Sequence, residues 1–156
     1  MRGRHITLFI VLFASIPFLG QSQAATDTDQ AAIVAFAQKA AVRAVNFQEG
    51  DVESLKRARA DFTAEGWKDF MKPMEGYLDP KGAPTFNSSF VPSGNARVVD
   101  EKDGIVHIRI PGTLKQSSKG SSTTYRAALD VHAGGHPIKI ERLEQIMCAG
   151  ASTACQ

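Results

Sequence analysis

Residues 96–110, ARVVDEKDGIVHIRI, decide the fold, because here the hydrophobic pattern changes from a helical period to a period of two. Asp103-Gly104 is a strong signal for a tight hairpin turn, so the segment is expected to form two antiparallel strands. The alternation in the second strand gives it one apolar face. The residues expected to point inward are Val106, Ile108 and Ile110.

Beyond residue 110 the strand pattern resumes after an interruption. The run GTLKQSSKGSST (residues 112–123) is mostly polar and is predicted to be a mobile loop. It leads into TTYRAALDVH (residues 123–132), which alternates as a strand does. The residues expected on its inward face are Tyr125, Ala127, Leu129 and Val131.

A final strand is predicted in HPIKIERLEQIM, residues 136–147. Its early apolar positions, such as Ile140, alternate properly, but Leu143 falls on the opposite parity. One extra residue would restore the register. A β-bulge is therefore expected near Glu141-Arg142, and it would also bend the strand.

The segment before residue 96 has a helical period. DQAAIVAFAQKAAVRAVNFQ (residues 29–48) carries an apolar stripe of about five turns, rich in alanine, which would let a sheet approach closely. Asp51 is a capping candidate for a second, short helix over residues 52–62. Thr63 can cap a third helix, residues 63–75.

Three helices followed by a curved antiparallel sheet make an α+β domain. We expect the N-terminal helices to pack on the sheet, which wraps around the alanine-rich helix as a half-open cone. This order of elements resembles the cystatin-like, or nuclear-transport-factor-like, cone fold. About 132 residues remain after the leader described next, which suits a single domain with one core.

The first 24 residues have the organisation of a secretory signal peptide. Arg2 and Arg4 form a basic start, residues 6–19 are apolar, and Ser22-Gln23-Ala24 offers small residues at a cleavage site. The apolar stretch is shorter than the roughly 20 residues that span a bilayer. Cleavage after Ala24 and a periplasmic location are expected, with an uncleaved inner-membrane anchor as the alternative.

Removal of the leader makes the chain neutral. Two of the 18 Lys and Arg residues lie in it, and the remaining 16 equal the 16 Asp and Glu residues. A protein that binds a polyphosphate backbone usually carries a basic excess. Nucleic acid is therefore not an expected partner.

Cys148 and Cys155 are the two cysteines of the chain, and both lie in the tail CAGASTACQ. In an exported protein such a pair is expected to form a disulfide. The tail lacks the His, Asp or Glu that a zinc site would need, and the spacing differs from that of a redox-active pair. The predicted organisation is a signal peptide (1–24), one domain (25–147) and a stapled tail (148–156).

The residues give little indication of catalysis. The inward positions are aliphatic except for Tyr125, which marks a candidate pocket for a small apolar ligand. His107 and His132 fall on the outward face and His136 lies in a turn, so all three are interpreted as solvated surface residues. No hydrolase, metallopeptidase or phosphate-binding motif occurs. We expect no enzyme activity, no cofactor and no metal site.

Residues 61–71, DFTAEGWKDFM, are similar to the Phe-Thr-x-x-Gly-Trp-x-x-Phe segment of the DotI/IcmL/TraM family. The matching positions are Phe62, Thr63, Gly66, Trp67 and Phe70. On a helix the three aromatic residues gather on one side, and Gly66 suggests that a neighbour packs close to the backbone. A looser likeness extends over residues 30–147.

The resemblance implies a non-enzymatic part of a type IVB secretion or conjugation-like apparatus, whose periplasmic domain has the cone fold. It also implies contacts with other envelope or secretion-apparatus proteins, and self-association is an open alternative. The short leader and the cysteine tail depart from the family pattern. Two other functions stay open: an exported protein that binds or converts a small apolar ligand, and an exported inhibitor or immunity-like binder.

Overall fold

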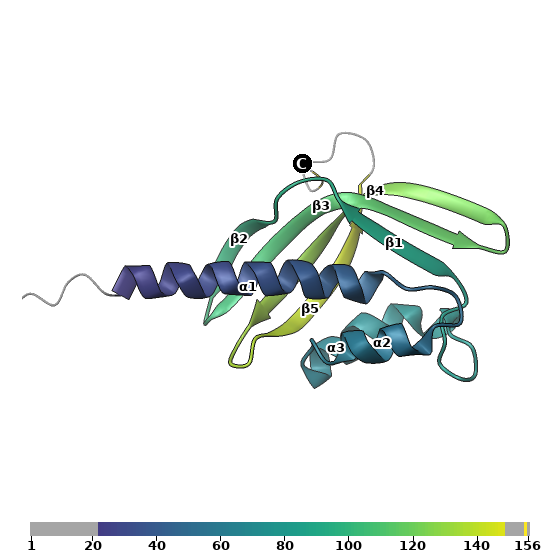
Figure 1. Cartoon of the computed structure of the whole chain (residues 1–156), viewed down its shortest axis with the longest axis horizontal. Helices are drawn as coiled ribbons and strands as arrows, with labels where there is room; N and C mark the ends of the chain where they lie inside the picture. Colours follow the sequence, from purple (N-terminus) through teal and green to yellow (C-terminus); the bar gives the residue numbers. More distant parts are fainter. Residues whose placement is uncertain (1–21, 149–154, 156) are drawn as a thin grey trace, which may run out of the picture.

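The structure of the chain is a computed structural model that describes residues 22–148 and Cys155. Its helices are α1 (Ser22–Val45), α2 (Val52–Arg59), α3 (Ala64–Met71) and the 3-10 helix η1 (Lys72–Tyr77). Its strands are β1 (Asn87–Pro92), β2 (Arg97–Lys102), β3 (Ile105–Ser118), β4 (Ser121–Gly134) and β5 (Lys139–Met147). The predicted α+β class is confirmed, with helices first and an antiparallel sheet after them (Figure 1).

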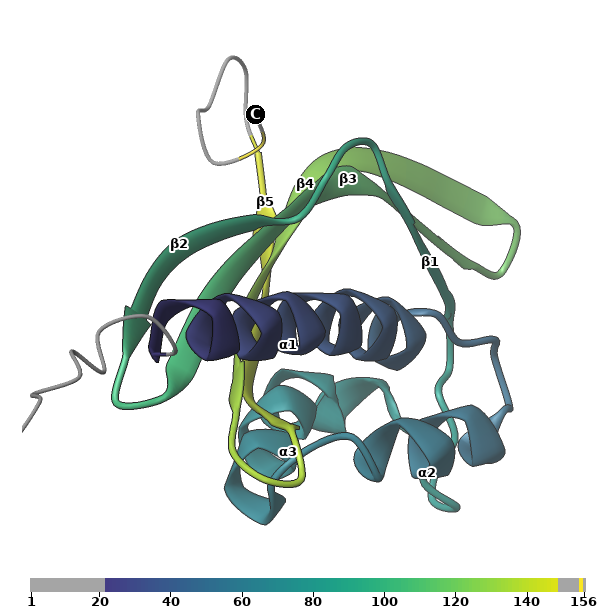
Figure 2. The same cartoon turned by 60° about the vertical axis from the view of Figure 1, so that its left-hand side comes forward.

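The sheet is built around the long hairpin of β3 and β4. β5 pairs with the far side of β4, while β1 and β2 both pair with β3. Figure 2 shows that the sheet arches over α1, with α2 and α3 on the opposite side of that helix. The sheet and the helices thus enclose α1 as the predicted cone does.

The core lies between α1 and the concave face of the sheet. The alanines of α1 that face it, Ala37, Ala40, Ala41 and Ala44, are buried. Their small side chains allow the helix to lie close to the strands, as the sequence predicts. Opposite them the inward residues of β3 and β4 are fully buried: Val106, Ile108, Ile110, Ala127, Leu129 and Val131.

Pro111 marks the point on β3 where one edge partner is exchanged for another. β2 pairs with residues 105–109 of β3, and β1 pairs with residues 112–117. Proline has no N–H to donate to a ladder, so a strand tolerates it where a partner strand ends. The backbone carbonyl of Pro111 accepts a hydrogen bond from the Ser93 N–H, in the segment that links the two edge strands.

The polar run over residues 112–123 is an ordered hairpin, and the prediction of a mobile loop is wrong. β3 and β4 stay in register without a break, from the pair of Ile105 with Gly134 to the pair of Ser118 with Ser121. The chain turns at Lys119 and Gly120, both of which have positive φ, as in a type I′ turn. Serine and threonine form these strands without apolar alternation, which is why the pattern did not reveal them.

The predicted bulge is present in β5. Ile140 pairs with Ala133 and Arg142 pairs with His132, so Glu141 is the extra residue. The bulge brings Ile140 and Leu143 to the same side, and both are buried. The parity break in the sequence therefore has the physical origin that was expected.

The helix boundaries differ slightly from the predicted ones. α1 begins at Ser22 and ends at Val45, whereas the prediction was 29–48. Asp51 caps α2 and Thr63 caps α3, as expected. The predicted leader falls almost wholly outside the described residues, so its cleavage stays a prediction. In the part of the chain that the structure describes, no helix is both long and apolar enough to cross a membrane.

Candidate functional site

Helix α3 is anchored on the bulge of β5 through backbone contacts. The hydroxyl oxygen of Thr63 accepts a hydrogen bond from the Gly66 N–H at 3.1 Å. The Thr63 N–H donates to the Ile140 carbonyl, and the Ile140 N–H donates to the Asp61 carbonyl, at 3.0 and 2.8 Å. Gly66 lies against the backbone of Ile140 and Glu141, which confirms the close approach expected at this glycine.

The three aromatic residues of the 61–71 segment pack on one another. The ring centroids of Phe62, Trp67 and Phe70 lie 5.3 to 5.6 Å apart. Phe62 and Phe70 are buried and Trp67 is partly buried against the same core. Burying such a ring stabilises the fold by about 2 kcal/mol. The five residues that carry the family resemblance therefore close the cone and dock α3.

Tyr125 lies at the open end of the cone rather than in its interior. Its exposed fraction is 37%, and it lines a cleft of about 420 Å³. The other lining residues are aromatic or hydroxyl- and amide-bearing: Tyr77, Thr85, Phe86, Gln116, Ser117, Ser118, Ser121 and Thr123. Among these described residues none carries a carboxylate or an imidazole. The cleft can hold a small molecule between aromatic rings and polar groups, but it offers no general base.

A second hollow adjoins this cleft and shares Tyr77, Phe86 and Gln116 with it. It encloses about 430 Å³ between η1, α3 and the end of β5. Asp69 and Glu144 are the described acidic residues in its lining. The two hollows therefore lie next to each other, with Tyr77, Phe86 and Gln116 between them.

The face of the sheet turned away from α1 carries an ordered polar cluster, which we call the outer-face cluster. Its members are Asp100, His107, Arg109, Asp130 and His132. His107 Nδ1 lies 3.2 Å from Asp100 Oδ2, and His107 Nε2 lies 2.9 Å from Asp130 Oδ1. The rings of His107 and His132 stack, with centroids 4.3 Å apart.

Burial and charge shift the pKa values of the outer-face cluster in different directions. Burial lowers the pKa of His107, but hydrogen bonds to Asp130 and Asp100 outweigh this and raise it above the ordinary value. Burial raises the pKa of Asp130, yet Arg109 and His107 bring it below the ordinary value. Burial, followed by the charge of His107, lowers the pKa of His132. As the pH falls, His107 is therefore protonated before His132.

The interpretation of His107 as a solvated surface residue is wrong, because only 13% of its side chain is exposed. His132 is partly buried as well. The sequence did contain a signal that His107 and His132 lie opposite each other. A two-residue turn at Lys119-Gly120 places His107 opposite His132 when the strands are counted back residue by residue. The prediction of a loop there concealed this register.

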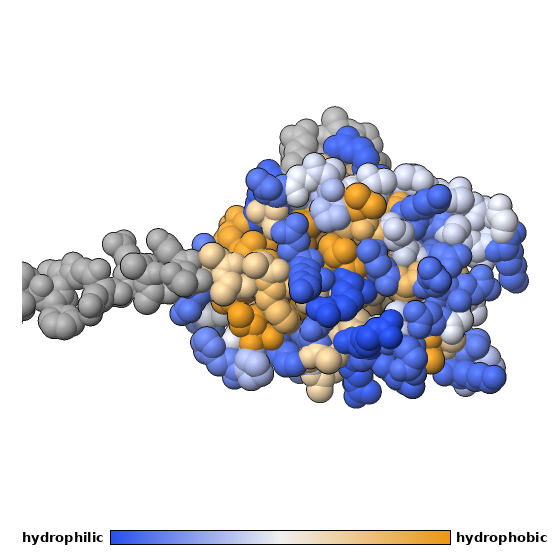
Figure 3. Space-filling view, in the orientation of Figure 1, coloured by the Kyte–Doolittle hydropathy of each residue, from blue (hydrophilic) through white to orange (hydrophobic). Residues whose placement is uncertain are grey.

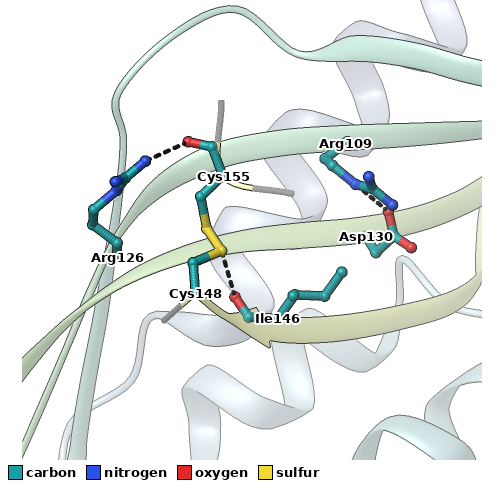
Figure 4. The surroundings of a disulfide bond; sticks show 6 residues. All are labelled: Arg109, Arg126, Asp130, Ile146, Cys148 and Cys155. Atoms are coloured by element: carbon teal, nitrogen blue, oxygen red, sulfur yellow. Dashed lines mark hydrogen bonds and ion pairs between the residues drawn. A yellow bond between two sulfur atoms is a disulfide. The ribbon is translucent and has the colours of Figure 1, made fainter. Parts of the chain in front are cut away.

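The predicted disulfide between Cys148 and Cys155 is present. Figure 4 shows the Cys155 carbonyl beside Arg126 of β4, whose guanidinium donates a hydrogen bond to it at 3.3 Å. The Cys148 N–H donates to the Arg126 carbonyl at 2.9 Å. The disulfide thus holds Cys155 against the sheet.

Two features of the described surface are the exposed strand β2 and an apolar region beside α1. Every residue of β2 is exposed, including Val98 and Val99, and among the described strands β2 pairs only with β3. Figure 3 shows a mostly hydrophilic face on which apolar side chains gather where α1 begins. Ile33, Ile105 and Ile138 line a hollow of about 300 Å³ at that end.

Comparison with known proteins gives matches by structure. No family model matches the chain, and no curated protein matches its sequence. The periplasmic domain of DotI superposes with a TM-score of 0.63 and 17% identity, over 76% of this chain and 95% of that one. An IcmL-like type IV secretion system protein from Legionella pneumophila superposes with a TM-score of 0.64 and 12% identity, over 80% of this chain and 97% of that one. A periplasmic fragment of TraM superposes with a TM-score of 0.58 and 13% identity, over 76% of this chain and 98% of that one.

These likenesses confirm the cone fold predicted from the sequence. They also confirm the resemblance to the DotI/IcmL/TraM family at the level of the fold. The aligned part includes nearly the whole length of each solved domain. The leader and the cysteine tail, which depart from the family pattern, lie at the ends of the chain.

Proposed function

We propose that this chain is a non-enzymatic periplasmic component or accessory protein of a type IVB secretion or conjugation-like apparatus. It acts through contacts with other envelope or secretion-apparatus proteins, after export through a cleaved signal peptide. One observation carries the proposal: the fold matches 95% to 98% of the length of the DotI, IcmL-like and TraM domains.

The interior of the cone supports a role without catalysis. Tyr125 lies at the rim, and the inward residues beside α1 are aliphatic and buried: Val106, Ile108, Ile110, Ala127, Leu129 and Val131. General acid–base catalysis needs a titratable group within hydrogen-bond reach of a bound substrate. The cleft beside Tyr125 presents hydroxyl and amide groups instead.

The exposed strand β2 supports a role in protein contacts. Val98 is 40% exposed and Val99 is 47% exposed, on a strand whose outer edge has no described partner. Exposed apolar residues beside unpaired backbone groups are typical of surfaces that another chain covers. A partner protein could therefore add to this edge and bury both valines.

Crosslinking in the living cell tests the proposal. A photo-crosslinking residue at Val98 should capture one or more envelope proteins of the apparatus, whereas the same residue at exposed Arg59 of α2 should not. Deletion of the coding sequence should lower conjugation or effector delivery. If Val98 captures no envelope protein and deletion leaves transfer unchanged, the proposal is wrong.

The cleft beside Tyr125 favours a second candidate function, the binding of a small ligand. Its volume of about 420 Å³ suits a compact molecule, and Tyr77, Phe86 and Tyr125 offer aromatic faces to it. Native mass spectrometry of freshly purified protein would detect a retained molecule. Tyr125→Ala should abolish that retention, while Tyr77→Phe, which keeps the ring, should preserve it. Protein that carries no extra mass contradicts this candidate.

A further inference from the structure

We propose that His107, Asp130 and His132 form a binding site for a divalent metal ion, and we expect that ion to be Zn²⁺. Each residue offers one donor atom, and these atoms all lie within 4.8 Å of one another. The residues come from β3 and β4, where His107 and His132 are direct cross-strand partners. The central hairpin of the sheet therefore holds all three donors.

One of the donor–donor distances is already close to the one that a bound ion needs. Zinc binds imidazole nitrogen and carboxylate oxygen at about 2.0 to 2.2 Å, which places tetrahedral donors roughly 3.3 Å apart. His107 Nε2 and Asp130 Oδ1 are already 2.9 Å apart. An ion would take the place of the proton that these atoms share, and the two side chains would separate by a few tenths of an ångström. The His132 ring is stacked on that of His107 with centroids 4.3 Å apart, so it would have to turn to aim its nitrogen at the ion.

A further carboxylate supports this reading independently of the donors. Asp100 Oδ2 lies 3.2 Å from His107 Nδ1, on the side of the ring away from Asp130. When Nδ1–H donates to Asp100, Nε2 keeps its lone pair for a metal. Metal-bound histidines commonly donate their other N–H to a carboxylate, which fixes the tautomer and the ring orientation.

Arg109 positions Asp130 and limits the affinity. Its Nε donates to Asp130 Oδ1 at 3.1 Å, and Figure 4 shows the two side chains facing each other. This contact holds the carboxylate ionised and in place. The guanidinium charge also opposes a nearby cation, so we expect micromolar binding rather than the tighter binding of a closed four-ligand site.

The chemistry of the donors selects the kind of ion. Two of the three donors are imidazole nitrogens, which suit Zn²⁺, Ni²⁺, Cu²⁺ and Co²⁺. Mg²⁺ and Ca²⁺ prefer sites made of oxygen atoms. Three protein ligands leave one tetrahedral position, which water can fill. Only 13% of the His107 and Asp130 side chains is exposed, so the ion would lie partly sheltered on the outer face.

Calorimetric titration tests the site directly. The full chain, purified without a polyhistidine tag and treated with a chelator, should bind one Zn²⁺ per molecule and gain thermal stability. His132→Gln and Asp130→Asn should each weaken binding at least tenfold. His136→Gln removes a histidine in the turn between β4 and β5, outside the set of three donors, and should bind Zn²⁺ within twofold of the unmodified chain.

A spectroscopic measurement on the unmodified chain keeps the test valid if a variant fails to fold. In NMR spectra of the histidine rings, added Zn²⁺ should shift the signals of His107 and His132 and leave those of His136 in place. The absence of saturable one-to-one binding overturns the proposal. So does binding that moves the His136 signals alone, or that folded His132→Gln retains within twofold.

Discussion

Gly66 of α3 lies directly against the backbone of Glu141 in β5. A Cβ at residue 66 would be 2.6 Å from the Glu141 carbonyl oxygen and 2.8 Å from that of Ile140. The helix therefore rests on the β-bulge through its own backbone. Glycine is a poor helix former, yet at this position it is the residue that permits the docking of the helix.

Gly66→Ala should destabilise the protein. The methyl group cannot fit without a backbone shift, and overpacking of this kind costs about 1 to 3 kcal/mol. The better helix propensity of alanine offsets roughly 1 kcal/mol of this. We expect a net loss of about 1 kcal/mol, and at most about 2 kcal/mol, in the free energy of unfolding by urea denaturation. Gly76→Ala is the matched control, because nothing lies within 4 Å of its Cβ, and it should change stability little.

Asn46→Ala should weaken the junction between α1 and β1. The Asn46 amide oxygen accepts from the Phe90 N–H, and its amide nitrogen donates to the Phe90 carbonyl. The side chain thus continues the backbone bridge between Phe47 and Ser88. Loss of both hydrogen bonds should lower stability by about 1 to 2 kcal/mol.

Thermal denaturation of Asn46→Ala beside Gln48→Ala would measure this effect. Gln48 is exposed on the same connection, so its replacement should be nearly neutral. Equal melting temperatures for the two variants would contradict the role assigned to Asn46.

Lys119→Asn should stabilise the hairpin of β3 and β4. Lys119 has a φ of 49° in the turn, a conformation that asparagine adopts more readily than lysine. We expect a gain of about 0.5 kcal/mol in the free energy of unfolding. Lys115→Asn, in the strand itself, should give no gain. If the two variants behave alike, residues 112–123 do not form the ordered hairpin.

Reduction of the Cys148–Cys155 disulfide should lower stability without loss of the fold. The closed loop is short, with a sequence separation of 7, so loop entropy contributes at most about 2.5 kcal/mol. The core residues lie elsewhere, in the helices and the sheet. The melting temperature should fall on addition of a reductant, whereas a Cys148→Ser, Cys155→Ser double variant should melt at one temperature in both conditions.

The sequence predicts the architecture well wherever apolar residues alternate or recur. The hairpin at Asp103-Gly104 and the bulge at Glu141 follow from local patterns, and both are present. It fails at residues 112–123, because strand formation there depends on the neighbouring strand rather than on burial of apolar side chains.

The polar cluster on the outer face was not predicted, for a related reason. Outward orientation of His107 and His132 is correct, but their partners depend on strand register. That register is set by the turn at Lys119 and Gly120, which the sequence pattern did not single out. The unrecognised turn therefore hid the contacts of His107 with Asp130 and His132, which cross from β3 to β4.

The change of edge strand at Pro111, from β2 to β1, also disfavours aggregation through the edge of the sheet. β1 and β2 have six residues each and are linked by residues 93–96. Together they take the place of one continuous edge strand along β3. Amyloid-like growth needs a long, flat row of unpaired backbone groups on which further chains can stack. The interrupted edge offers no long template of this kind.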